Sequence, residues 1–398
     1  MVERNPGRDT PAPVSLTLSG GDPPPTLPRL GGCEPFTDAY FLRSLEILRA
    51  EGLNPWVRAQ VMIREGPGKV GGMTEAIELI EHFGRVSAAG GSLRALAEGD
   101  TYASLETLLL IEAPIQSIIA LETVYLGALS AGTTRLNGGP REVDLGAVTR
   151  QTRAVVEAAG GRPVMYFGAR HWHYQDDASI AQAAFAGGAS SCSTLAGAAT
   201  AGQEAVGTIP HVLENIMAWR FGTGRAVVEA ALAFDRVINP SVPRVALIDY
   251  ANREIEDSLV TAAALGSRLW GVRVDTCGEN RAEGALASPA DSGSSPLFAG
   301  VKLPSLGDPD ARFWYGNGVT ITGVYALRRA LDEAGFGAVR IALSSGFADP
   351  VKVRAFARAE EHLGIRLFDA LGVGGLYESR SAKMDIVGVG EIAVKGNE

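Results

Sequence analysis

The strongest constraint on the fold of this chain is an alternating pattern that begins near Val148. From there on, short apolar or β-branched runs alternate with amphipathic helical patterns. Such alternation is typical of βα units, whose strands lie parallel in one sheet. The expected strands are residues 163–167, 186–190, 205–208, 245–248, 269–274, 339–343 and 367–371. Consecutive units of this kind predict an α/β protein built on an irregular parallel (β/α) barrel of about seven strands.

The first third of the chain follows a different pattern. Between residues 36 and 147, expected helices at 39–50, 73–83 and 107–129 mix with short β-rich pieces such as 60–63, which indicates a compact α/β layer. Residues 1–35 contain eight of the 21 prolines and are expected to form an extended arm. Residues 278–318, rich in Gly, Ser and Pro, form a connection far longer than usual and are read as a lid or an insertion.

Composition excludes several classes of partner. The net charge is -9 and the pI near 5.3, so we expect no basic face for nucleic acid. The most apolar stretch, residues 108–129, is interrupted by Glu112 and Glu122, so no segment is expected to span a membrane. Three distant cysteines suit neither a disulfide framework nor a zinc site, and favour the reducing cytoplasm.

Polar residues gather where the expected strands end, which is where α/β barrels place their reacting groups. These residues are Arg170, His171, His173, Ser190, Ser191, Ser193, Thr208, His211, Asp249, Arg273, Asp275, Ser344, Ser345, Gly346, Gly372, Gly374 and Gly375.

Two of these strand ends are candidates for binding phosphate. LSSGF (343–347) and LGVGG (371–375) are small-residue turns whose backbone N–H groups could approach an anion closely, although each could also be a plain tight turn. Arg273 and Asp275 alternate on one strand end and Asp249 ends the strand before it. This trio could hold a magnesium-bound polyphosphate, or form a structural ion pair at the rim of the barrel.

Two other barrel chemistries find less support. His171 and His173 have the spacing of paired metal ligands, but the remaining histidines do not fall at the later strand ends where a metal-dependent barrel hydrolase needs its remaining ligands. A Schiff-base aldolase needs a lysine at a strand end, and no lysine lies at an expected strand terminus.

Seven motifs occur in the order found in nicotinate phosphoribosyltransferases, and over residues 36–390 the chain resembles that family. The motifs are TDAYF (37–41), LETVYLG (121–127), FGAR (167–170), GTIPH (207–211), RVDT (273–276), SSGF (344–347) and DALGVGG (369–375). The resemblance implies a type II phosphoribosyltransferase barrel at 148–375. It also implies an N-terminal α/β domain at 36–147 that is completed by residues 376–398.

The resemblance implies a reaction as well. Nicotinate and 5-phosphoribosyl 1-pyrophosphate would give nicotinate mononucleotide and pyrophosphate in NAD salvage, with ATP coupling left open. The family site forms between the subunits of a dimer, so the resemblance implies a homodimer or a higher homo-oligomer with a shared active site. Loss of pyrophosphate leaves positive charge on the ribose, so Mg²⁺ and basic residues must take up negative charge on the leaving group.

Roles for individual residues follow from the resemblance. Arg170 and Arg273 would bind phosphate or pyrophosphate oxygens, and Asp249 and Asp275 would face the ribose and Mg²⁺. The 5-phosphate would be held by Ser344, Ser345, Gly346, Gly372, Gly374 and Gly375. The flat pyridine would stack between Phe167 and Tyr40, the latter following Asp38 and coming from the neighbouring subunit, although Phe167 could simply be core.

Two further roles concern the acceptor and ATP. Nicotinamide-using relatives place an aspartate near residues 187–194, where this chain offers Ser190 and Ser191, and hydroxyls favour the carboxylate of nicotinate. His211 matches the histidine that is phosphorylated in ATP-using members, with Thr208 beside it, although a capping or core histidine is the alternative. The open alternatives are a nicotinamide or quinolinate phosphoribosyltransferase and a non-catalytic phosphoribosyl or nucleotide-binding homologue.

Overall fold

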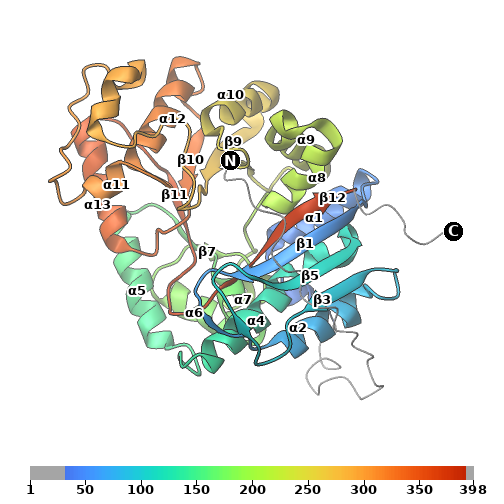
Figure 1. The fold of residues 1–398 in the computed structure, drawn as a ribbon. Helices are drawn as coiled ribbons and strands as arrows, with labels where there is room; N and C mark the ends of the chain where they lie inside the picture. Colours follow the sequence, from blue (N-terminus) through green and yellow to red (C-terminus); the bar gives the residue numbers. More distant parts are fainter. Residues whose placement is uncertain (1–31, 391–398) are drawn as a thin grey trace.

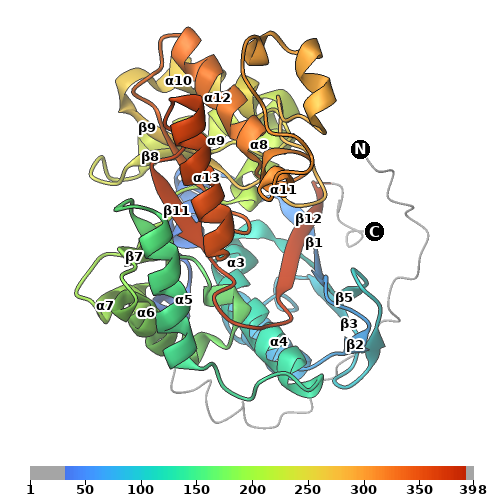
Figure 2. The same ribbon diagram turned by 90° about the vertical axis from the view of Figure 1, so that its left-hand side faces the viewer.

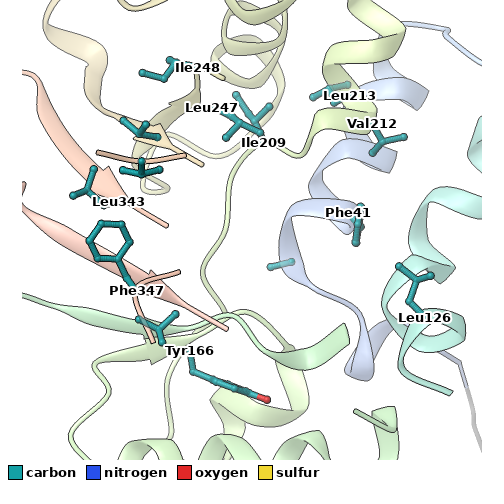
Figure 3. Packing of buried hydrophobic residues seen from close by; sticks show 14 of the residues in the cluster. Phe41, Leu126, Tyr166, Ile209, Val212, Leu213, Leu247, Ile248, Leu343 and Phe347 are labelled. Atoms are coloured by element: carbon teal, nitrogen blue, oxygen red, sulfur yellow. The ribbon is translucent and has the colours of Figure 1, made fainter. Parts of the chain in front are cut away.

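The structure is a computed structural model, and it describes residues 32–390. Most of the predicted Pro-rich arm therefore lies outside the described residues. The chain forms a mixed α/β fold with an antiparallel sheet near the N-terminal third and a curled parallel sheet beyond it (Figures 1 and 2). Buried side chains from the helices and both sheets join into one hydrophobic cluster, part of which Figure 3 shows.

The antiparallel sheet has the order β12-β1-β5-β3, with β1 at Trp56–Ile63, β3 at Ser92–Ala95, β5 at Thr107–Pro114 and β12 at Ala382–Val389. A small pair, β2 (Gly68–Lys69) and β4 (Thr101–Tyr102), lies apart from it. The last strand of the described chain therefore pairs with the first, because Ile63 lies opposite Ala382 and Val57 opposite Val389.

One expected helix is partly wrong. Residues 107–114 form the buried strand β5, and helix begins only with α3 (Ile115–Ile118), continuing through the turn Ile119–Leu121 into α4 (Glu122–Leu136). An apolar run cannot be assigned to strand or helix by periodicity alone, and here pairing with β1 decides for strand. The segment Ile115–Leu136 is long and apolar enough to cross a membrane, but 78% of its apolar window is buried inside the molecule, where it serves as core.

Two other helices pack beside this segment. Helix α1 (Ala39–Ala50) has the expected bounds, and α2 (Met73–Leu79) continues into a π-helical turn at Ile80–Gly84. The start of α1 places Asp38 and Tyr40 beside the parallel sheet, where Asp38 bridges to Thr194.

Six strands, not seven, form the parallel sheet within the described residues. Their order is β7-β6-β11-β10-β9-β8, with β6 at Val164–Tyr166, β7 at Ser191–Cys192, β8 at Arg244–Leu247, β9 at Leu269–Val274, β10 at Arg340–Leu343 and β11 at Ala370–Val373. The sheet curls into a half barrel, and β7 and β8 are its two edges.

The expected seventh strand, 205–208, has no ladder partner in the described chain. The Arg43 guanidinium on α1 donates to the carbonyl oxygens of Ala205 and Gly207, which occupies two acceptors that a neighbouring strand would need. The segment keeps one backbone bond to β7, from Val206 N to Cys192 O, and one side-chain bond to β8, from Thr208 Oγ1 to Val245 O at 2.7 Å. It bridges the two edges of the half barrel without becoming a strand.

Amphipathic helices follow the parallel strands and lie along the outside of the half barrel (Figures 1 and 2). They are α5 (Leu145–Ala158), α6 (Asp177–Ala186), α7 (Leu195–Ala199), α8 (His211–Phe221), α9 (Ala226–Val237), α10 (Glu254–Leu265), α12 (Ile321–Glu333) and α13 (Pro350–Leu363). The long connection 278–318 contains the short helices Pro289–Ser294, Pro296–Phe298 and α11 (Ala311–Trp314). It packs on the body of the protein, since the buried Phe298 contacts Tyr325 of α12.

Candidate active site

Five of the predicted site residues line one cavity of about 110 Å³ between the two sheets. They are Tyr40, Arg170, His211, Arg273 and Asp275. Arg170 follows β6, Arg273 and Asp275 end β9, and His211 begins α8. The antiparallel sheet closes the cavity with Met384, Asp385 and Ile386 of β12. Residues from both halves of the chain therefore meet at the carboxyl end of the parallel sheet.

A network of buried carboxylates holds Arg170 beside Tyr40. The Arg170 guanidinium donates to Glu122 Oε1 at 2.6 Å, and its Nε lies 3.9 Å from Asp38 Oδ2. Asp38 also accepts from the Tyr40 hydroxyl at 3.2 Å and from Thr123 Oγ1 at 2.9 Å. Burial raises the pKa of Glu122 to about 7, although the neighbouring guanidinium opposes that shift. Two buried carboxylates, Glu122 and Asp38, thus hold the arginine at the edge of the cavity.

His211 lies between two carboxylates. Its Nδ1 is 3.0 Å from Glu214 Oε2, and its Nε2 is 3.3 Å from Asp249 Oδ2. Burial opposes protonation of this ring, but the charges of Asp249 and Glu214 outweigh it and hold the pKa of His211 well above its ordinary value. Burial also raises the pKa of Glu214 to about 7. The three side chains together keep a proton on the imidazole at neutral pH.

Asp249 and Asp275 have oxygens available for a cation. Asp249 Oδ1 is buried and has no hydrogen-bond partner within residues 32–390, whereas Asp275 Oδ2 accepts from Arg273 at 3.1 Å. No group of three or more metal-ligating side chains occurs in the described part of the chain. Mg²⁺ commonly binds through one or two carboxylates together with substrate oxygens and water, so this donor set fits a magnesium ion that arrives with a phosphorylated substrate.

The two predicted phosphate turns lie side by side at the ends of β10 and β11. Ser344 N donates to Val274 O, so this turn directly adjoins the end of β9. Ser345 and Gly346 both have left-handed backbone, with φ of +67° and +81°.

Gly372 and Gly374 have a packing reason to be glycine. A Cβ on Gly372 would lie 2.7 Å from the Phe167 ring, and one on Gly374 would lie 2.9 Å from the ring of His171. Packing alone therefore accounts for glycine at these two positions, so the glycines are weaker evidence for a phosphate site than the sequence suggested. Gly375 is open instead, although its N–H already donates to His171 Nδ1 at 3.0 Å.

Ser190 lies at the wrong end of its strand to meet the acceptor. The strand forms at Ser191–Cys192 instead of 186–190, and both Ser190 N and Ser190 Oγ donate to the carbonyl of Val164, the first residue of β6. The residue that follows β7 is Ser193, which is 0% exposed and whose hydroxyl has no hydrogen-bond partner in the described chain. Ser193 O accepts from Ala39 N at 2.7 Å, beside Asp38 and Tyr40.

Thr208 and the two early histidines have other partners. The Thr208 hydroxyl is used by Val245 O, as described above. His171 accepts from Gly375, and burial lowers its pKa to about 4. His173 instead contacts Glu75 Oε1 at 3.0 Å on α2. The two rings therefore diverge and do not form a paired metal site.

Sequence reasoning missed several residues at this site. Glu214 had a readable signal, because a carboxylate three residues after a histidine shares its face of a helix. Glu122 lies inside a motif already identified, LETVYLG. Met384, Asp385 and Ile386 had no such signal, since only the pairing of β12 with β1 brings them to the cavity.

Comparisons with known proteins agree with the motifs. No family model matches the chain. Nicotinate phosphoribosyltransferase pncB1 from two strains of Mycobacterium tuberculosis is 26% identical over 188 residues, which is 47% of this chain and 38% of the relative. The matched region thus spans well under half of the curated relatives' length.

Solved structures share the fold over most of the chain. Nicotinate phosphoribosyltransferase from Porphyromonas gingivalis has a TM-score of 0.57 at 15% identity, with 88% of each chain covered. The enzyme from Vibrio cholerae has a TM-score of 0.59 at 13% identity, with 89% of this chain and 85% of that chain covered. The resemblance predicted from the motifs is confirmed: the curated relatives, and solved structures that share this fold, are nicotinate phosphoribosyltransferases.

Proposed function

We propose that the protein joins nicotinate to 5-phosphoribosyl 1-pyrophosphate, giving nicotinate mononucleotide and pyrophosphate for NAD salvage. The observation that carries this proposal is the meeting of Arg170, Arg273, His211 and Asp275 in one cavity at the carboxyl end of the parallel sheet. The curated relatives and the shared fold support the same activity.

The charges in this cavity suit the departure of pyrophosphate. As the bond from ribose C1 to the pyrophosphate oxygen lengthens, positive charge grows on the sugar and negative charge on the leaving group. Arg273 and the protonated His211 would stabilise the leaving oxygens, and the carboxylate of Asp275 would face the sugar. Preorganised charges of this kind need little rearrangement during the reaction, which is why they accelerate it.

Asp249 and Asp275 would hold Mg²⁺ together with pyrophosphate oxygens. A bound Mg²⁺ would supply further neutralisation of the leaving group. The unpartnered Asp249 Oδ1 supports this assignment.

The acceptor ring would lie between Phe167 and Tyr40, and the Ser193 hydroxyl would donate a hydrogen bond to the carboxylate of nicotinate. Ser193 replaces Ser190 in this role because it follows β7 at the correct end and its buried hydroxyl is free to donate. Buried polar groups normally find a partner, so an orphan hydroxyl beside Ala39 supports a ligand contact there.

Three further features of the family are extended to this chain by proposal. These are a homodimer in which Tyr40 reaches the neighbouring site, phosphorylation of His211 when ATP is used, and a cytoplasmic location. In the single chain, Tyr40 lines the cavity of its own subunit. The shared site therefore stays a prediction that mixed dimers can test, since wild-type Tyr40 opposite a mutant site should restore acceptor use.

The experiment that tests the proposal is a steady-state assay with Mg²⁺, 5-phosphoribosyl 1-pyrophosphate and each of three acceptors. We expect turnover with nicotinate, and little with nicotinamide or quinolinate. Turnover of nicotinamide alone would defeat the acid assignment. Binding of the sugar substrate without release of pyrophosphate from any acceptor would favour the non-catalytic homologue.

A pair of serine variants tests the acceptor pocket. Ser193→Asp should lower kcat/KM for nicotinate by about 100-fold or more, because two carboxylates would repel each other in a buried place. Ser190→Asp is the matched control, since that exposed residue lies at the far end of the strand and should change kcat/KM little. Equal effects of the two substitutions would contradict the placement of the acceptor.

A further inference from the structure

We propose that Lys352 is a binding residue for the 5-phosphate of the sugar substrate, supplying a cation at the turn that follows β10. This inference deepens the proposed function and rests on it for the identity of the substrate. Lys352 is the third residue of α13, in the first turn of the helix after the β10 loop, and sequence analysis found no role for it.

The ammonium group of Lys352 lies directly at the Ser345–Gly346 turn. Its Nζ donates to Ser345 O at 3.1 Å and would be 3.5 Å from a Cβ placed on Gly346. The same Nζ lies 4.3 Å from the centre of the Phe347 ring, which is buried. The stem of the side chain is thus held against the turn while its head occupies the space that Gly346 leaves open.

Lys352 differs from the arginines at this site because, among residues 32–390, no carboxylate forms an ion pair with it. Arg170 pairs with Glu122, and Arg273 pairs with Asp275. In the described part of the chain Lys352 makes no ion pair, and the nearby Asp349 uses its carboxylate to accept from Val351 N. Burial lowers the pKa of Lys352 to about 8, only partly opposed by Asp349. A half-buried cation that forms no ion pair within the described residues is a costly arrangement that an anionic ligand would relieve.

The turn that follows β11 lies close to the turn that Lys352 contacts. Gly375 approaches the β10 turn, since a Cβ on it would lie 3.9 Å from that of Ala348 and would meet no closer atom. Two successive left-handed residues, Ser345 and Gly346, shape the turn beside Nζ. Lysine binds phosphate as a compact point charge, and here it could move from the carbonyl of Ser345 to a phosphate oxygen.

Binding of ribose 5-phosphate, which has the 5-phosphate but no pyrophosphate, tests the inference by calorimetry. Lys352→Met should weaken the binding of ribose 5-phosphate by about 10- to 100-fold, which is the loss expected for a hydrogen bond to a charged group. The affinity for pyrophosphate should stay unchanged. Lys352→Arg should recover part of the affinity. Arg354→Met is the matched control, because it removes an exposed cation two residues further along the same helix. Equal ribose 5-phosphate affinity for wild type and Lys352→Met would overturn the assignment, as would an equal loss for pyrophosphate.

A measurement on the unaltered protein covers the case in which a Lys352 variant does not fold. Amine acetylation followed by mass spectrometry should label Lys352 readily, and ribose 5-phosphate should protect it at least tenfold relative to Lys302. Absence of protection at saturating ligand would refute the contact. If Lys352 is protected but no acceptor is turned over, the phosphate contact stands and the proposed transferase activity falls. If nicotinate is turned over without protection, the reverse holds.

Discussion

The two sides of the candidate site hold their charge in different ways. On the β8–β9 side, His211, Asp249, Arg273 and Asp275 are already paired with one another or with Glu214. On the β10–β11 side, small-residue turns and backbone N–H groups predominate, and Lys352 forms no ion pair within the described chain. When a substrate binds, the charged residues on the β8–β9 side must exchange some of their present ion pairs for contacts with the substrate. On the β10–β11 side, Lys352 can bind a phosphate without breaking an ion pair. This difference suits the proposed reaction, in which pyrophosphate leaves from the β8–β9 side while the 5-phosphate of the sugar stays bound on the β10–β11 side.

The largest effect should come from the paired side. Asp275→Ala should lower kcat by about 100- to 1,000-fold, because it removes a charge that faces the reacting sugar. Its side chain is 28% exposed and packs against no core, so thermal unfolding should change little. Steady-state kinetics and calorimetric unfolding check both parts. Unchanged turnover would remove Asp275 from the mechanism.

A smaller loss of turnover is expected when Glu214, the partner of His211 Nδ1, is replaced. Glu214→Leu leaves His211 Nδ1 without its acceptor and should reduce kcat by about 10- to 100-fold with little change in KM, a typical cost of a misplaced acid–base group. Glu214→Gln keeps an acceptor oxygen near that nitrogen and should restore part of the rate. If leucine and glutamine cost the same, Glu214 does not act by positioning the ring.

On the β10–β11 side, the next largest effect concerns the stability of the fold, at a glycine that packing requires. Gly372→Ala should lower the free energy of unfolding by about 1 to 3 kcal/mol, because the new Cβ overlaps the Phe167 ring. Gly293→Ala meets no atom within 4 Å and serves as the control. Urea unfolding of both variants distinguishes them, and a neutral Gly372→Ala would mean that the Phe167 ring moves freely.

The smallest effect concerns pH. The pKa of His211 is raised in the folded protein, so its stabilising contribution is complete below about pH 6.5 and is lost as pH rises through the folded value. The raised pKa of Glu214 acts in the same direction between its ordinary value and about 7. The stability difference between wild type and His211→Asn should therefore shrink with rising pH. Solvent screening of the half-exposed imidazole should keep the change below about 1 kcal/mol, and a difference that grows with pH would contradict this pairing.

The sequence predicted local features of this molecule better than those that depend on topology. Residues at the ends of β6, β9, β10 and β11 were found because a strand end leaves a local pattern, and the structure brings them to one edge. Ser190 was misplaced because a two-residue strand leaves almost no signal, and its true bounds lie a few residues later. The expected seventh strand failed because Arg43, far away in sequence, binds its carbonyls. No local pattern contains such a long-range contact.

The pairing of β12 with β1 also affects how the protein is made. Met384, Asp385 and Ile386 line the cavity, so a nascent chain cannot complete this site until β12 has left the ribosome. Until then β1 presents an unprotected edge, to which a second nascent chain could add. A chain cleaved by a protease just before Ala382 would keep its parallel half barrel but lose the part of the cavity lining that β12 supplies.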